Sequence, residues 1–320
     1  MNKEGSLSIN SENIFPIIKK WLYSDHDIFF RELVSNGCDA VTKLKKLDMI
    51  GEYTIPEGKE LCVKVTADAE TKTITFTDNG IGMDANEIDQ YINQIAFSGA
   101  RDFLDKYKDK TNDDQIIGHF GLGFYSAFMV ADRVTIDSLS YKEGAKAVHW
   151  ESDEGTSFEM TDSAKTEIGT TITLYLNEDS YEFCNEYRAK EILDKYCSFM
   201  PIPIYFEAIK TAEEQARIDE AEKKAKEEEE KRKAEEAAKK AADGEAAEAE
   251  TEAEPVEKAP ETPKPINETT PLWAKHPNEC TDEEYKEFYH RVFHDYKEPL
   301  FWIHLNMDYP FNLKGILYFP

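Results

Sequence analysis

Three polar side chains whose types could support phosphate chemistry occur at regular spacing near the start of the chain. Glu32, Asn36 and Asp39 follow one another at intervals of four and three residues, so a helix would place them on one face. A carboxylate can act as a general base toward water, and an amide oxygen is a suitable ligand for Mg²⁺. Polar helix faces usually meet solvent, so this pattern alone also fits an ordinary solvated stripe.

The segment that carries these side chains has the periodicity of an amphipathic helix. Phe30, Val34 and Val41 repeat on a different face from the polar stripe and are expected to enter the core. We expect the helix to run from Phe29 to about Asp48, with Asp25 capping its start. The polar stripe would then be held on a well-packed element.

Two glycine-rich stretches further along the chain change the interpretation of the stripe. Residues 78–83 follow a predicted strand, and residues 118–123 precede an apolar segment expected to form a helix over 124–130. Glycine-rich turns before a helix let backbone N–H groups approach a phosphate. Asp78 stands directly before the first glycines, where a buried carboxylate could accept a hydrogen bond from the amino group of adenine.

Other nucleotide-binding motifs fit the sequence less well. Residues 80–85 match the glycine spacing of a dinucleotide fingerprint, but no strand–helix–strand unit with the expected spacing follows them. The chain contains no GxxxxGK[ST] motif, which excludes a P-loop protein.

The remaining patterns predict an α+β protein. Early helices and later, mostly antiparallel strands favour a two-layer α/β sandwich, with one sheet covered by helices on one face. The expected helices are 11–23, 87–95 and 181–200; the segment 98–115 is expected to be irregular; the expected strands are 61–65 and 74–76 as a hairpin, then 133–141, 145–151, 157–161, 170–176 and 201–207.

Charge and composition limit the classes of partner. The 320 residues carry a formal net charge of −27, which argues against nucleic acid because phosphate binding needs a basic surface. The chain starts without an apolar signal region, and its longest apolar run, residues 120–131, is shorter than the roughly 20 residues that span a bilayer. Five cysteines without CxxC spacing are expected to be reduced thiols of a cytoplasmic protein.

A charged segment divides the chain. Residues 211–266 are rich in Ala, Glu and Lys and poor in large apolar residues, with a net charge of −9 over 212–261. We expect a solvated helix over 212–242 and disorder over 243–265. A spacer between domains is the favoured interpretation, with binding of a basic partner as the alternative.

The composition becomes globular again after the charged segment. Residues 281–296 predict a helix capped by Thr281, and strands are expected over 300–305 and 314–319. A segment this short is not expected to close a comfortable core by itself, so it is interpreted as a truncated second domain. His290 and His294 could form a zinc pair on the helix, although surface or core histidines are the default interpretation.

Taken together, these motifs resemble those of the GHKL ATPases, and among them the heat shock protein 90 family of chaperones, in particular its bacterial HtpG type. The resemblance covers nearly all of residues 6–208 and resumes from Pro271 to the end of the chain. It implies a Bergerat-type ATP-binding domain over 1–210, a charged linker over 211–266 and the beginning of an α/β middle domain over 267–320. The motifs that carry the resemblance are residues 31–40, 78–83, 118–127 and 169–170.

The resemblance also implies a ligand and roles for individual residues. Mg²⁺ with ATP or ADP would be bound, Asn36 would ligate the metal, and Glu32 would be the general base, with Arg31 beside it pairing with Glu32 or with phosphate. Asp78 and Thr170 would read the adenine. The residues expected to contact the nucleotide are Asn36, Asp39, Ala40, Asp78, Gly82, Met83, Asn93, Gly118, Phe120, Gly121, Gly123, Phe124 and Thr170.

The same resemblance predicts an ATP-dependent cytoplasmic chaperone whose partners are client proteins and co-chaperones, without nucleic acid or membrane binding. The family supplies a catalytic arginine and a dimerisation domain from further along, so this chain is expected to be a slow, monomeric ATPase within a homodimeric full-length protein. Residues 91–99 are shorter than is usual in the family, and Phe97 replaces a common lysine. A different GHKL enzyme, such as a histidine kinase or a topoisomerase, and a nucleotide-regulated scaffold without useful hydrolysis are the alternatives.

Overall fold

A computed structural model describes residues 25–94, 99, 103, 106, 116–118, 121–153, 155–211, 215, 217, 224, 263–307 and 313–320. The helix expected over 11–23, most of the irregular segment over 98–115 and most of the charged linker lie outside these residues. None of the described helices combines the length and the apolar character that a membrane crossing requires.

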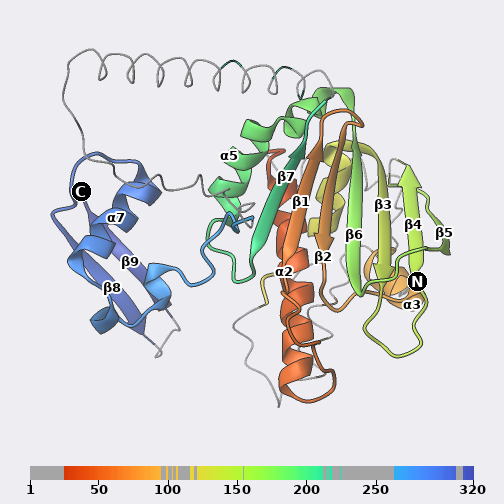
Figure 1. Cartoon of the computed structure of the whole chain (residues 1–320), viewed down its shortest axis with the longest axis horizontal. Helices are drawn as coiled ribbons and strands as arrows, with labels where there is room; N and C mark the ends of the chain where they lie inside the picture. The colour runs from red at the N-terminus through yellow and green to blue at the C-terminus, as the bar shows by residue number, and fades with distance from the viewer. Residues whose placement is uncertain are drawn as a thin grey trace, which may run out of the picture.

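A seven-stranded sheet forms the framework of the larger part of the chain (Figure 1). Its strand order is β5-β4-β3-β6-β2-β1-β7, and every neighbouring pair is antiparallel except the parallel pair of β1 and β7. The strands are β1 Val63–Asp68, β2 Thr73–Asp78, β3 Ala131–Leu139, β4 Val148–Asp153, β5 Glu159–Asp162, β6 Gly169–Leu176 and β7 Ile204–Ile209.

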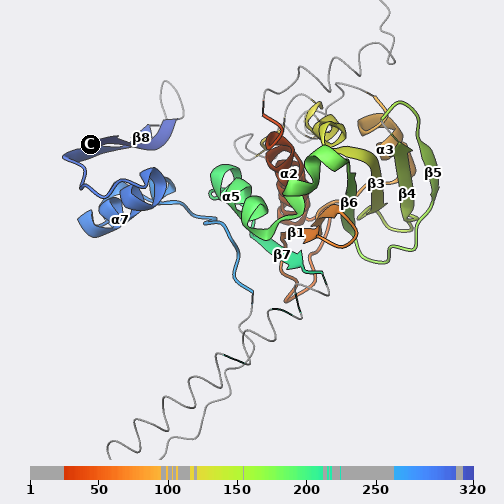
Figure 2. The same ribbon diagram turned by 90° about the horizontal axis from the view of Figure 1, so that it is seen from above.

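Helices cover one face of this sheet, as Figure 2 shows for α2 (Ile28–Met49) and α5 (Glu186–Cys197). The core lies between the two layers, where Phe29 and Phe30 of α2 pack edge-on against Phe76 of β2. The expected two-layer sandwich is therefore confirmed. Because α2 lies directly on the central strands, the sheet fixes its position.

The periodicity of α2 is observed as predicted, but its start differs. Phe30, Val34 and Val41 are fully buried, whereas the residue at the N-terminal boundary is Asp27, whose side chain makes no capping hydrogen bond. Asp25 does not cap the helix either. Its carboxylate accepts the backbone N–H of Asp27 at 3.2 Å and also contacts side chains of α5, so it is occupied outside the helix.

Three further segments depart from the sequence-based expectation. The apolar segment after the second glycine-rich stretch is a 3-10 helix, η1 (Gly123–Met129), with nearly all of its side chains buried, so packing overrides helical propensity. The helix expected over 181–200 is split into η2 (Glu178–Cys184) and α5, because Asn185 caps the backbone N–H groups that begin α5. Helix α3 (Ala85–Tyr91) begins two residues early at a capping box formed by Asp84 and Glu87.

After the charged segment, the chain forms a small helix-on-hairpin unit. Helix α7 (Asp282–Phe293) begins at the expected Thr281 cap and packs against the antiparallel strands β8 (Phe301–Met307) and β9 (Leu313–Phe319). Two short 3-10 helices, η3 (Leu272–Ala274) and η4 (Pro277–Glu279), precede α7.

The chain returns to the sheet domain before this unit begins. The side chain of Asn267 is buried and makes three hydrogen bonds of 2.8 Å, to the carbonyls of Met200 and Ile202 and from the N–H of Ile204. The N–H of Ile266 donates to the carbonyl of Ile204. Residues on the far side of the charged segment are thus held at the edge of the sheet.

Candidate functional site

A cavity of about 1000 Å³ lies between α2, the central strands and the two glycine-rich stretches. Side chains and backbone from stretches far apart in the sequence converge on it. The predicted site residues that line it are Arg31, Glu32, Asn36, Asp39, Ala40, Asp78, Gly82, Met83, Gly118, Gly121, Gly123, Phe124 and Thr170. The polar stripe of α2 therefore faces the cavity and is not a solvated surface.

Asp78 is the last residue of β2, and it lines the cavity. Asp78 is 8 % exposed and lies opposite Thr170 of β6 in the antiparallel register. Burial raises the pKa of Asp78 to about 7, although the backbone N–H of Gly80, which donates to its carboxylate at 2.9 Å, acts in the opposite direction. A buried carboxylate that faces the cavity can select a ligand with an N–H donor.

The loop after Asp78 is held tightly between α2 and the end of β3. A Cβ atom on Gly80 would overlap the backbone of Ala40 in α2, and a Cβ atom on Gly82 would overlap the carbonyl of Leu139. Gly82 also has a φ of +62°, which favours glycine. At both positions the neighbouring backbone is so close that there is no room for a side chain.

Hydrogen bonds fix the same loop to the floor of the cavity. The N–H of Met83 donates to the hydroxyl of Ser138 at 2.8 Å, and this hydroxyl is 2.9 Å from the hydroxyl of Thr170. The N–H of Ile81 donates to the carbonyl of Ala40. The residues expected to surround an adenine ring are thereby arranged before any ligand binds.

The second glycine-rich stretch approaches α2 at the other side of the cavity. The carboxylate of Asp39 accepts the backbone N–H groups of Ile117 and Gly118 at 2.8 and 2.7 Å. A Cβ atom on Gly123 would overlap the carboxylate of Glu32, and one on Gly118 would lie 3.6 Å from the amide oxygen of Asn36. Because these positions are glycines, the backbone comes close to these oxygen atoms, and a side chain at Gly123 would have no room.

Arg31 and Glu32 form an ion pair at the cavity wall. The guanidinium of Arg31 donates to the carboxylate of Glu32 at 2.6 and 3.2 Å. The side chain of Arg31 is about half exposed and that of Glu32 is mostly buried. The carboxylate is therefore held near the glycine-rich stretch by a cation that can move without disturbing the core.

Two predicted site residues are not among those that line the cavity. Asn93 was expected beside the sugar, but its side chain accepts the indole N–H of Trp150 at 2.9 Å and donates to Asp89. These contacts hold the amide against β4 and α3, and a sugar contact by Asn93 stays a prediction. Phe120 lies outside the described residues.

Sequence reasoning missed several residues that line the cavity. Lys43 continues the spacing of the polar stripe one turn beyond Asp39, so the periodicity of α2 could have identified it. Tyr141 and Lys142 carry no comparable signal, since they follow β3 and reach the cavity through a non-local contact, in which the N–H of Tyr141 donates to the carbonyl of Ile81. Lys142 forms a rim ion pair of 2.9 Å with Glu87, another missed residue.

The geometry also decides the weaker alternatives. A dinucleotide fold would need parallel strands around residues 80–85, whereas β2 pairs antiparallel with both β1 and β6. His290 lies on α7, but His294 follows the end of that helix in a left-handed conformation. Among the described residues there is no group of three or more His, Cys, Asp or Glu side chains that could hold a metal ion.

The fold and the cavity define a GHKL-type nucleotide-binding ATPase domain. Residues 28–179 match the family model described as "Histidine kinase-, DNA gyrase B-, and HSP90-like ATPase". Residues 182–320 match the family model described as "Hsp90 protein". The two matches are adjacent and together cover nearly all the described residues, so the chain belongs to the HSP90 family.

Similar proteins support the same assignment. The chain is 48 % identical over 318 residues to a protein named chaperone protein htpG from Bacteroides fragilis strain 638R, covering 99 % of this chain and 40 % of that protein. The protein of the same name from Bacteroides thetaiotaomicron is 46 % identical with the same coverage. The one from Porphyromonas gingivalis W83 is 43 % identical over 320 residues, 100 % of this chain. The chain spans about 40 % of the length of these relatives.

Proposed function

We propose that this chain is the nucleotide-binding part of an ATP-dependent molecular chaperone of the bacterial HtpG type. The observation that carries the proposal is one cavity that is lined by buried Asp78, by the glycine-rich stretch at Gly118 and by the polar side chains of α2. The carboxylate of Asp78 accepts a hydrogen bond from the amino group of adenine, and the hydroxyl of Thr170 supports this contact. Gly82 and Met83 lie along the base, while Gly121, Gly123 and Phe124 lie on the phosphate side.

Mg²⁺ is expected with the nucleotide, and the residues present fit it. Asn36 and Gly118 both line the cavity, and a hard cation with few protein ligands completes its shell with phosphate oxygens and water. When bound, the ion would neutralise charge on the phosphates. Asn36 holds its oxygen toward this position from the rigid helix α2.

Glu32 is proposed as the general base of ATP hydrolysis. Its carboxylate lies beside Gly123, where a γ-phosphate and an attacking water would meet a base held on the core helix. Arg31 shares the carboxylate by an ion pair and would have to release it for Glu32 to orient water. Turnover by this chain is expected to be slow.

At the level of the whole protein, we propose that hydrolysis drives a conformational cycle that acts on client proteins in the cytoplasm, with co-chaperones as further partners. Residues 1–210 would be the ATP-binding domain, 211–266 the charged linker and 267–320 the beginning of a middle domain. This chain would be a monomer, and the full-length protein a homodimer. The names and the extent of the relatives support this part of the proposal.

Thermal unfolding with and without Mg·ADP tests the binding site. A ligand at about 100 times its dissociation constant stabilises the folded state by about 2.7 kcal/mol, which raises the unfolding midpoint by on the order of 5–10 °C. We expect this rise for the wild-type chain, no rise for Asp78→Asn, and no rise with NAD. A rise with NAD, or none with ADP, would contradict the proposed ligand.

A second experiment tests the enzymatic role and separates it from a scaffold that merely binds nucleotide. Glu32→Ala should retain ADP affinity and lose at least tenfold in the rate of ATP hydrolysis. The comparison should also be made in a protein extended to the full length of the relatives. Unchanged hydrolysis in Glu32→Ala would exclude Glu32 as the general base and favour the scaffold alternative.

A further inference from the structure

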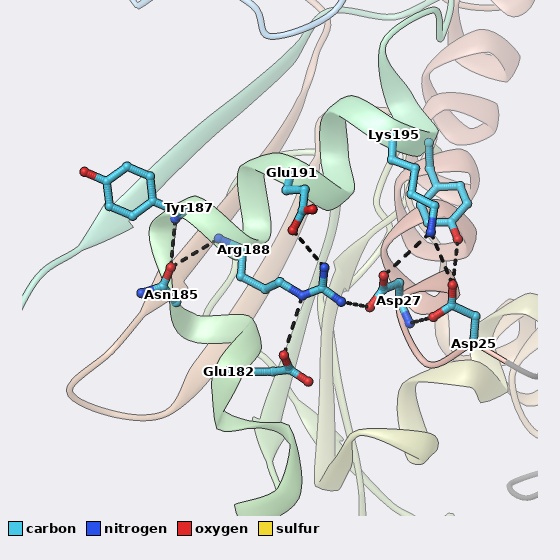
Figure 3. Close-up of polar contacts among 9 residues, drawn as sticks. Asp25, Asp27, Glu182, Asn185, Tyr187, Arg188, Glu191 and Lys195 are labelled. Atoms are coloured by element: carbon cyan, nitrogen blue, oxygen red, sulfur yellow. Dashed lines mark hydrogen bonds and ion pairs between the residues drawn. The ribbon is translucent and has the colours of Figure 1, made fainter. Parts of the chain in front are cut away.

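An ion-pair network lies at the start of α2, outside the cavity (Figure 3). Its centre is Asp27, whose side chain is only 8 % exposed. Although Asp27 is the boundary residue of α2, its carboxylate makes no hydrogen bond to the helix. It lies instead 2.7 Å from Nη2 of Arg188 and 3.8 Å from Nζ of Lys195, both on α5.

Arg188 is itself held in place from several directions. Asn185 accepts the backbone N–H of Arg188 at 3.2 Å and thereby fixes the first turn of α5. The guanidinium also contacts the carboxylates of Glu191 at 2.8 Å and Glu182 at 3.5 Å, as Figure 3 shows. A planar guanidinium with several donors suits a position between carboxylates, where lysine could serve only one of them at a time.

A second acidic residue, Asp25, extends the ion-pair network to the chain that precedes α2. Asp25 lies 3.3 Å from Nζ of Lys195 and accepts the hydroxyl of Tyr196 at 3.1 Å. Asp25 also accepts the backbone N–H of Asp27. Side chains of α5 therefore bind two carboxylates in the chain that leads into α2.

The network is close to Glu32 and farther from the residues that would hold the nucleotide. Glu32 follows Asp27 by five residues, about 7.5 Å along a helix at 1.5 Å per residue. Asn36 and Asp39 follow Asp27 by nine and twelve residues, about 13.5 and 18 Å along the same helix, and Asp78 belongs to a different element. Loosening the start of α2 should therefore displace Glu32 more than it disturbs the nucleotide-binding residues.

We propose that Arg188 is a positioning residue for ATP hydrolysis, which acts by clamping Asp27 and so fixing the start of the helix that carries Glu32. The inference rests on the proposed function, because it assigns the general base to Glu32. Arg188 lies outside the cavity and touches no ligand. Its effect is predicted to fall on the rate of the chemical step and not on nucleotide affinity.

The test compares the maximal rate of ATP hydrolysis with the affinity for ADP measured by calorimetry. Arg188→Gln should lower the rate about five- to tenfold and leave the dissociation constant for ADP within twofold, and Arg188→Lys should recover at least half of the rate. Lys190→Gln is the matched control, since it removes the same charge from an exposed pair with Glu186 on the same helix. It should match the wild type in both measurements.

A double-mutant cycle with Glu32→Ala identifies the route of the effect. In the Glu32→Ala background, Arg188→Gln should change the residual rate of ATP hydrolysis by less than twofold. Radiolabelled ATP makes this low rate measurable. The proposal is overturned if Arg188→Gln leaves the rate unchanged, if rate and ADP affinity fall in parallel, or if the loss persists without Glu32. Asp27→Asn provides the same test should Arg188→Gln fail to fold. If Glu32→Ala itself leaves the rate unchanged, the proposed function fails, whatever Arg188 does.

Discussion

The carboxylate of Asp39 accepts the backbone N–H of Gly118 at 2.7 Å and thereby joins α2 to the second glycine-rich stretch. The same carboxylate accepts the N–H of Ile117 at 2.8 Å, so both of its oxygen atoms anchor this stretch. One helix thus presents Glu32 to the cavity and also sets the position of the backbone expected to surround the phosphates. The sequence predicted Asp39 as a nucleotide contact, and the structure adds an anchoring role to that prediction.

Asp39→Asn should weaken ADP binding about tenfold. An amide has one acceptor oxygen and would lose one of the two hydrogen bonds, and a bond to a charged group contributes about 1.5–3 kcal/mol. Calorimetric titration with Mg·ADP measures the change. Asp48→Asn is the matched control, because Asp48 anchors the N–H of Ile55 from the exposed end of the same helix. Equal losses in both variants would show a general effect on α2 instead of an anchoring role.

Nucleotide binding should depend on pH through Asp78. Burial raises the pKa of this group to about 7, and protonation turns one of its acceptor oxygens into an O–H donor, which cannot accept a hydrogen bond from the adenine amino group. Since protonation competes with binding, affinity should fall as the pH decreases through 7, by about tenfold between pH 8 and pH 6.

Adenosine is the suitable probe for this experiment, because it lacks phosphates that titrate in the same range. Its dissociation constant should be measured from pH 5.5 to pH 8.5 for the wild type and for Asp78→Asn. The variant should bind weakly without the same pH dependence. A wild-type affinity that stays constant over this range would contradict the assignment of Asp78 as the base-reading group.

Gly123→Ala should reduce hydrolysis with little change in stability. The added Cβ atom would overlap the carboxylate of Glu32, and a flexible side chain can move aside without unfolding the domain. A displacement of about 1 Å of a reacting group can cost on the order of 100-fold in rate, so we expect at least a tenfold loss. ADP affinity should stay within about threefold.

Gly315→Ala is the control for this substitution, since among the described residues no atom, its chain neighbours aside, lies within 4 Å of the Cβ position at Gly315. ATP hydrolysis, ADP titration and the thermal unfolding midpoint are measured for both variants. Full hydrolysis in Gly123→Ala would mean that Glu32 does not act from the position described.

Local sequence patterns predicted the elements of this site better than the contacts between them. The spacing of Glu32, Asn36 and Asp39 placed them together on α2, because helical periodicity is a local property. Alternation of polar and apolar residues likewise located β1, β2 and β6. The orientation of the Asn93 side chain was not predictable in this way, because its amide oxygen accepts the indole N–H of Trp150, which lies on a strand distant in sequence.

The path of the chain after the charged segment was also beyond sequence reasoning. The segment reads as a spacer between independent domains, but Asn267 is buried against the carbonyls of Met200 and Ile202. A lone asparagine near prolines gives no local signal for such a contact. The hydrophobic contacts around Phe199, which packs on Trp273 with ring centroids 4.5 Å apart, are equally non-local.

Asn267→Ala should release the unit that follows the charged segment from the sheet domain. The substitution removes three hydrogen bonds of 2.8 Å and leaves buried backbone groups without partners, at a cost of about 1–3 kcal/mol for each such group.

A specific protease site placed at Gly244 allows the chain to be cut within the charged segment, and native gel filtration then shows whether the two pieces remain together. We expect co-elution for the wild type and separation for Asn267→Ala. Asn278→Ala, at an exposed position of the same unit, should behave like the wild type. Separation of the cut wild-type pieces would mean that Asn267 does not hold the unit on the sheet domain.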